Sequence, residues 1–129
     1  MSTFPPLNHF ALTVSDLDQS MAWYERLFGL PPVVVIDEAT YRAVVWFEPV
    51  FALHEHQHKH EGDTFDEYRL GLDHIAFGCS SREELEGWPA RLDELGIIDG
   101  EIVDASYGSG LALRDPDHIA LEFFLVAGS

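Results

Sequence analysis

The sequence predicts an α+β fold made of two tandem βαβββ modules. Each half of the chain begins with an alternating apolar pattern, continues with apolar residues at helical spacing, and ends with three further alternating runs. A chain of 129 residues is long enough for one domain with a sizeable core. We therefore expect one domain over residues 1–129, with modules at about 7–56 and 72–126 and a linker at 57–70.

The first module starts with a strand in which apolar residues alternate. A helix follows, because Asp16 and Gln19 have the spacing of a capping box and Gly29 stands where a left-handed C-cap belongs. A turn at Glu48-Pro49 separates its last two strands. The expected strands cover residues 9–14, 33–37, 41–47 and 50–56.

The second module has the same order of elements. Ser81 and Glu84 form another capping box, and Gly96 stands at the expected helix end. Pro89 lies inside this helix, where a missing backbone donor is expected to kink the helix or leave only a short first segment. The expected strands cover residues 72–79, 101–105, 108–113 and 118–126.

The two modules also share residue identities at constant spacing, which marks an internal repeat. A shift of 65 positions superimposes six identical pairs: His9 and His74, Ala11 and Ala76, Ser15 and Ser80, Trp23 and Trp88, Arg26 and Arg91, Leu27 and Leu92. At the other end, a shift of 68 positions lays residues 51–54 over 119–122. That second shift predicts His54 as the counterpart of Glu122.

Composition limits the classes of function. Seven basic and 23 acidic side chains give a net charge of −16, which repels phosphate backbones and anionic membranes. The sequence has no run long enough to span a membrane and no signal peptide, so we expect a cytoplasmic protein. The single Cys79 lies in an apolar run, which favours a packed thiol over a nucleophile.

Four predicted strands each carry one metal-competent side chain on the face opposite the large hydrophobic residues. Each of these side chains has an alanine two residues away on the same face, so the face is open and concave. Three imidazoles and a carboxylate suit a divalent Fe, Mn, Co, Ni or Zn ion, and an octahedral ion keeps two positions for water or substrate. The predicted ligands are His9, His54, His74 and Glu122.

The ligand at His54 has two alternatives. His56 lies on the same strand face, and Glu55 would reach this face if a bulge intervened. His58 and His60 belong to the irregular linker, where we expect them to be solvated unless the linker acts as a lid.

The sequence resembles the vicinal-oxygen-chelate superfamily, which includes glyoxalase I, extradiol dioxygenases and bleomycin-resistance proteins. The resemblance covers almost the whole chain and rests on several segments: His9, Ser15-Asp16-Leu17, Trp23-Tyr24, Phe28-Gly29-Leu30, Asp73-His74-Ile75-Ala76-Phe77, and Arg114-Asp115-Pro116-Asp117 with Glu122. It implies two modules whose mixed sheets form an open cup around a metal, a glyoxalase-like fold, with ligands from the first and fourth strand of each module. It also implies a homodimer.

The resemblance further implies a metal-dependent lyase or isomerase that acts on a small molecule with vicinal oxygens through a metal-stabilised enediolate. Glu122 is then the expected base, with His56 and Tyr107 as further acid or base candidates. One alternative is an extradiol-type ring-cleavage dioxygenase, although Ala112 stands where such enzymes usually have tyrosine. Another alternative is a metal-free protein that binds a small molecule and confers resistance to it.

Overall fold

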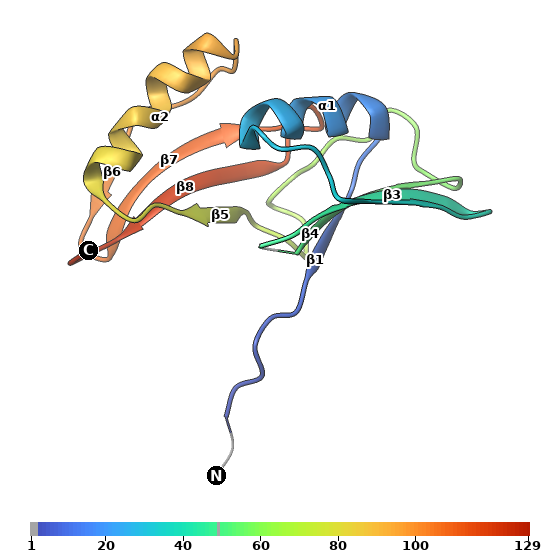
Figure 1. Ribbon diagram of the computed structural model, residues 1–129, viewed down its shortest axis with the longest axis horizontal. Helices are drawn as coiled ribbons and strands as arrows, with labels where there is room; N and C mark the ends of the chain where they lie inside the picture. The colour runs from blue at the N-terminus through green and yellow to red at the C-terminus, as the bar shows by residue number, and fades with distance from the viewer. Residues whose placement is uncertain (1–2, 49) are drawn as a thin grey trace. The chain divides into compact units, whose positions relative to one another are not determined.

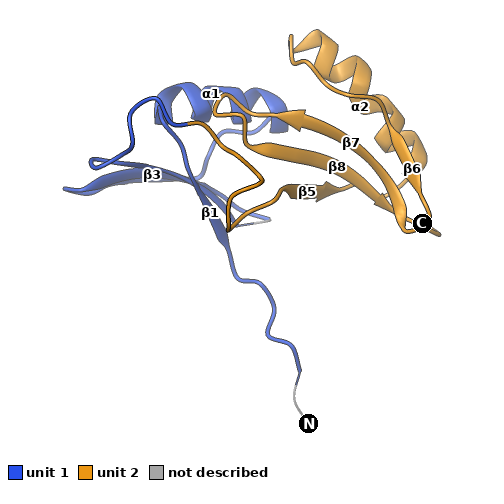
Figure 2. Ribbon diagram, turned by 180° about the vertical axis from the view of Figure 1, so that it is seen from behind, with its two compact units in different colours: residues 1–63 blue, residues 64–129 orange. Residues whose placement is uncertain are grey.

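The structure is a computed structural model that describes residues 3–48 and 50–129, so Pro49 of the expected turn lies outside the described residues. The chain divides into two compact units, residues 1–63 and 64–129 (Figure 2). The division falls within the predicted linker.

The first unit is a four-stranded sheet covered on one face by helix α1 (Figure 1). The strand order is β1-β4-β3-β2; β1 and β4 are parallel, and the other neighbours are antiparallel. Its elements are β1 (Phe10–Thr13), α1 (Leu17–Phe28), β2 (Val34–Asp37), β3 (Tyr41–Trp46) and β4 (Phe51–His56).

Helix α1 begins and ends as its sequence predicts. Asp16 Oδ1 accepts a hydrogen bond from the backbone N–H of Gln19 at 3.1 Å, and Gly29 has a φ of 73°. Phe51 of β4 contacts the aromatic side chains of the helix, since its ring centroid lies 5.1 Å from that of Tyr24 and 5.7 Å from that of Phe28. This aromatic core covers the sheet face opposite the predicted ligands.

The second unit repeats this topology. Its strand order is β5-β8-β7-β6, and β5 and β8 are again the parallel pair. Its elements are β5 (Ile75–Gly78), α2 (Arg82–Glu94), β6 (Val103–Ala105), β7 (Gly108–Arg114) and β8 (Ala120–Val126). The prediction of an α+β fold with two tandem βαβββ modules is therefore confirmed.

Helix α2 continues through Pro89, so the prediction of a short first segment is wrong. The lost ladder bond is offset by packing on both sides of the proline: Leu85 and Leu92 are fully buried, and Trp88 stacks on Phe123 with ring centroids 3.8 Å apart. Gly96, with a φ of 72°, ends the helix as expected.

The second part of the predicted linker is attached to the second unit. The backbone N–H of Phe65 donates to the carbonyl of Asp117 at 3.0 Å, and Arg114 pairs with Glu67 at 2.6 Å. Residues 64–70 thus lie against the turn between β7 and β8, although they form no helix or strand. None of the helices in the described part of the chain is long and apolar enough to span a membrane.

Candidate functional site

The strand ladders of the two units determine which residues are true counterparts. Ala11 of β1 pairs with Ala52 of β4, and Ala76 of β5 pairs with Glu122 of β8. Since Ala11 and Ala76 occupy the same repeat position, the counterpart of Glu122 is Ala52. The prediction that His54 is the counterpart of Glu122 is therefore wrong.

The correct shift for the fourth strand is 70 positions rather than 68, so His54 corresponds to Phe124. The ladders agree, because Thr13 pairs with His54 in one unit and Gly78 pairs with Phe124 in the other. Both shifts are even and keep the same strand face, so alternation in the sequence could not distinguish them. His54 lies about 7 Å further along its strand than the position equivalent to Glu122.

His9 and His74 stand just before the first strand of their own modules and are held in the same way. His9 Nδ1 lies 2.5 Å from Asn8 Oδ1, and His74 Nδ1 lies 2.6 Å from Asp73 Oδ1. An amide oxygen and an ionised carboxylate only accept, so each Nδ1 is the donor. Each neutral ring then keeps a lone pair on Nε2, the arrangement found in metal-binding histidines with an oriented ring.

Glu122 is a half-buried carboxylate on the small-residue face of the second sheet. It pairs across the ladders with Ala76 and Ala112, and a Cβ atom added to Gly110 would lie 2.8 Å from Glu122 Oε2. Within residues 3–48 and 50–129, this carboxylate has no hydrogen bond or ion pair. Glu122 therefore keeps its oxygens available for a ligand.

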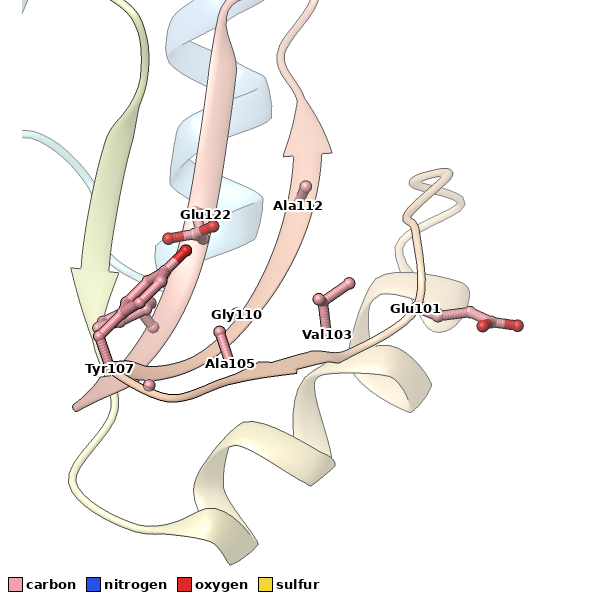
Figure 3. Close-up of a pocket in the computed structure, with 9 residues that line it drawn as sticks. Glu101, Val103, Ala105, Tyr107, Gly110, Ala112 and Glu122 are labelled. Carbon is pink, nitrogen blue, oxygen red and sulfur yellow. The ribbon is translucent and has the colours of Figure 1, made fainter. Parts of the chain in front are cut away.

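A cavity of about 110 Å³ opens beside Glu122 on the second sheet (Figure 3). Tyr107, in the turn between β6 and β7, stacks on Phe124 with ring centroids 6.1 Å apart and 20° between the ring planes. Figure 3 shows the Tyr107 side chain pointing toward Glu122. The structure thus brings together two of the three predicted acid or base residues.

The third predicted acid or base residue, His56, belongs to a group of rings on the first sheet. His54 stacks on Tyr41 with ring centroids 5.2 Å apart, and His56 lies 5.8 Å from His54. Burial lowers the pKa of His54, and the nearby His56 and His9 lower it further. His54 is therefore kept as a neutral imidazole, which can accept a proton or bind a metal.

Glu55 faces the helix and not this group of rings. Its carboxylate accepts a hydrogen bond from the Leu17 backbone N–H at 2.6 Å and lies 3.4 Å from Lys59 Nζ. This carboxylate stabilises the start of α1, where a negative charge is favourable. Sequence reasoning missed this capping role because the partners are 38 positions apart.

Cys79 is half-buried, and burial raises the pKa of its thiol, with a further contribution from the nearby Glu84. A raised pKa keeps the thiol protonated at neutral pH and makes it a poor nucleophile.

The predicted ligands are divided between the units: His9 and His54 belong to the first, and His74 and Glu122 to the second. Within neither unit do three or more described His, Cys, Asp or Glu side chains come close enough to hold a metal ion.

Comparison with known proteins places this fold in a family. The sequence profile of the Glyoxalase/Bleomycin resistance protein/Dioxygenase superfamily matches residues 6–123, and the chain belongs to this superfamily. A glyoxylase/bleomycin resistance protein/dioxygenase domain from Frankia sp. EAN1pec is 32% identical, with a TM-score of 0.86 over 96% of this chain and 99% of that chain.

Two more distant structures share the fold. Lactoylglutathione lyase from Agrobacterium tumefaciens is 19% identical, with a TM-score of 0.72 over 96% of each chain. The fosfomycin resistance protein FosX from Listeria monocytogenes is 20% identical, with a TM-score of 0.69 over 98% of this chain and 97% of that chain. No curated protein sequence matches the chain.

Proposed function

We propose that this protein is a metal-dependent enzyme of the glyoxalase type, a lyase or isomerase that acts on a small molecule with two adjacent oxygens. The observation that carries the proposal is Glu122, a half-buried carboxylate without a protein partner in the described residues, beside a cavity. Leaving a carboxylate partly buried and unpaired is unfavourable, so its position is best explained by a ligand.

The donor set that we propose is His9, His74 and Glu122. Two imidazoles and a carboxylate suit divalent Fe, Mn, Co, Ni or Zn. Both histidines have an Nδ1 hydrogen bond to the preceding side chain, which leaves Nε2 as the donor atom. His54 was predicted as a fourth ligand, but it lies two residues beyond the position that matches Glu122. We therefore propose that His54 contacts substrate and is not required for metal binding.

A FosX structure from Listeria monocytogenes is complexed with Mn(II) and a sulfate ion, which supports a divalent metal for this chain as well. Such a metal would supply Lewis-acid stabilisation of negative charge on the substrate oxygens.

In this proposal, side chains of the protein transfer the proton. We propose that Glu122, once released from the metal, accepts a proton from the substrate, and that the Tyr107 hydroxyl, which points toward it, donates its proton to the product and is reprotonated from Glu122. His56, whose ring lies 5.8 Å from that of His54 on the first sheet, is a further proposed acid or base. Tyr107→Phe tests the first assignment, because it removes the hydroxyl and keeps the ring.

Metal analysis of untagged protein tests the proposal directly. The protein is stripped by chelator, reloaded with Mn, Fe(II), Co, Ni or Zn in turn, and analysed for bound metal. We expect one metal ion per chain in the wild type and its loss in His74→Ala and Glu122→Gln. His58→Ala is the matched control, since His58 is exposed and lies outside the proposed site. Absence of stoichiometric metal, or equal binding by the two ligand variants, would disprove the proposal.

The two rival functions give different results in the same preparations. An extradiol-type dioxygenase would consume oxygen in the presence of a catechol, and an oxygen electrode detects this. A metal-free binding or resistance protein would bind its small molecule equally well with and without the metal. Screening diketones, hydroxy-acyl thioesters and catechols with the reloaded protein separates a lyase or isomerase from both rivals.

We also propose that the protein is a homodimer, in line with its superfamily membership. Light scattering coupled to size exclusion measures this directly, and a mass of one chain would contradict it.

A further inference from the structure

We propose that the cavity beside Glu122 is the subsite for a single planar ring without negative charge, and that Tyr107 and Phe124 are its platform. The assignment names the substrate class of the proposed enzyme and in that respect rests on the proposed function. All residues that line this cavity belong to the second unit.

The size of the cavity suits one ring. Its volume is about 110 Å³. An engineered apolar cavity of about 150 Å³ binds benzene, so a cavity that is slightly smaller but open on one side can receive a six-membered ring. A peptide conjugate or a nucleotide would not be enclosed.

The lining of the cavity is partly apolar and includes two aromatic rings that lie nearly parallel. Tyr107 and Phe124 stack with 20° between their ring planes, and Tyr107 is 73% exposed, so its ring surface is available to a ligand. A planar ring would extend this stack, which favours aromatic groups over saturated ones of equal size. The small side chains of Ala105 and Ala112 also line the cavity, whereas the space beside Gly108 and Gly110 is filled by the side chains of Phe124 and Glu122.

The charge of the cavity disfavours anions. None of the nine described residues that line it is Lys, Arg or His. Figure 3 shows the Glu101 carboxylate directed away from the other lining residues, so Glu122 supplies the negative charge inside. In the metal-free protein, an anionic group placed there would lose its hydration without gaining a positive partner. The net charge of −16 also repels anions at long range.

Three small ligands of similar size distinguish the effect of charge from the effect of a planar ring: benzamide, benzoate and cyclohexanecarboxamide. Their binding to the full-length, chelator-treated protein is measured by titration with NMR detection, so that no metal can attract the benzoate carboxylate. Because an unpaired buried charge is unfavourable, we expect benzamide to bind at least about tenfold more tightly than benzoate. From the stacking contribution, we expect it to bind about threefold more tightly than cyclohexanecarboxamide.

Two tyrosine variants test the platform. Tyr107→Leu should weaken benzamide binding by about three- to tenfold and remove the preference for the planar ring. Tyr68→Leu is the matched control, because Tyr68 is 93% exposed and does not line the cavity. Absence of saturable benzamide binding, benzoate binding as tight as that of benzamide, or equal effects of the two variants would overturn the inference.

The outcome is independent of the metal measurement. If metal binding is lost in Glu122→Gln but benzoate binds as well as benzamide, the ring subsite is wrong and the proposed function stands. If the ring series behaves as expected but the protein binds no metal, the proposed enzymatic function fails and the ring subsite stands.

Discussion

The two modules have one topology but carry different chemistry at matching ladder positions. The fourth strand of the first module has Ala52 where that of the second has Glu122, and His54 where the second has Phe124. The first sheet therefore carries a group of imidazole rings, and the second carries a carboxylate beside a cavity.

The two modules thus share the backbone ladder but differ in the side chains on the open face. The faces covered by the helices changed less in character, since both are filled by buried aliphatic and aromatic residues.

The largest effect concerns Gly108, whose ladder counterpart is Tyr41, because Gly108 pairs with Val126 and Tyr41 pairs with His56. The first module holds a tyrosine at this position, whereas in the second a Cβ atom would lie 2.5 Å from the Leu125 carbonyl oxygen. Gly108→Ala should lower the free energy of unfolding by about 3 kcal/mol, as overpacking against backbone does.

Gly87→Ala is the control for this substitution in a denaturant titration. Gly87 is exposed in α2 and has nothing within 4 Å of an added Cβ, so the alanine should stabilise the protein by about 0.5–1 kcal/mol. If Gly108→Ala is as stable as Gly87→Ala, the described packing of Phe124 and Leu125 at this position is wrong.

The second effect concerns the proposed metal site and the corrected register. Glu122→Ala should lower metal affinity by at least about 100-fold, since loss of an outer partner alone costs about 10- to 100-fold. His54→Ala should leave the affinity nearly unchanged, and Ala52→Glu should raise it, because only Ala52 matches Glu122 on the ladder. Competition with a metal-sensitive dye measures all three; a large loss in His54→Ala would restore His54 as a ligand.

A third effect concerns Ser20 of α1, whose repeat counterpart is Leu85 of α2. Both are buried, but Ser20 Oγ has no hydrogen-bond partner among the described residues, whereas Leu85 fills its site with carbon. Ser20→Ala should raise the free energy of unfolding by about 1 kcal/mol, because a buried hydroxyl without a partner is unfavourable. Thermal unfolding would show this, and a destabilised variant would reveal a partner for the hydroxyl.

The smallest expected effect is on the pH dependence of stability, which should differ between the starts of α1 and α2. Glu84 is the counterpart of Gln19, and hydrogen bonds from the Ser80 side chain and backbone lower the pKa of its carboxyl. A lowered folded-state pKa adds stability that is present above the unfolded-state pKa and is lost as pH falls through the folded-state value. The melting temperature of Glu84→Gln should therefore fall less than that of the wild type between about pH 6 and pH 3. Parallel curves would contradict the assignment.

The element order, the helix caps and the face of each strand could be predicted from the amino-acid sequence alone. Asp16, Ser81 and Gly29 act locally, through hydrogen bonds or backbone angles that involve only a few neighbouring residues. Strand alternation likewise assigned Glu122 and His54 to the open faces, because successive side chains of a strand must point to opposite sides.

The tertiary structure was needed to show which open-face residues of the two modules occupy equivalent positions, and which side chains contact one another. The loops of the two modules differ in length, so a sequence shift of 68 was as acceptable as one of 70, and the ladder selected Ala52. The use of Glu55 at the start of α1 and the stack of Tyr107 on Phe124 also depend on residues far apart in the chain. Such contacts are set by strand register, which no local pattern of period two can fix.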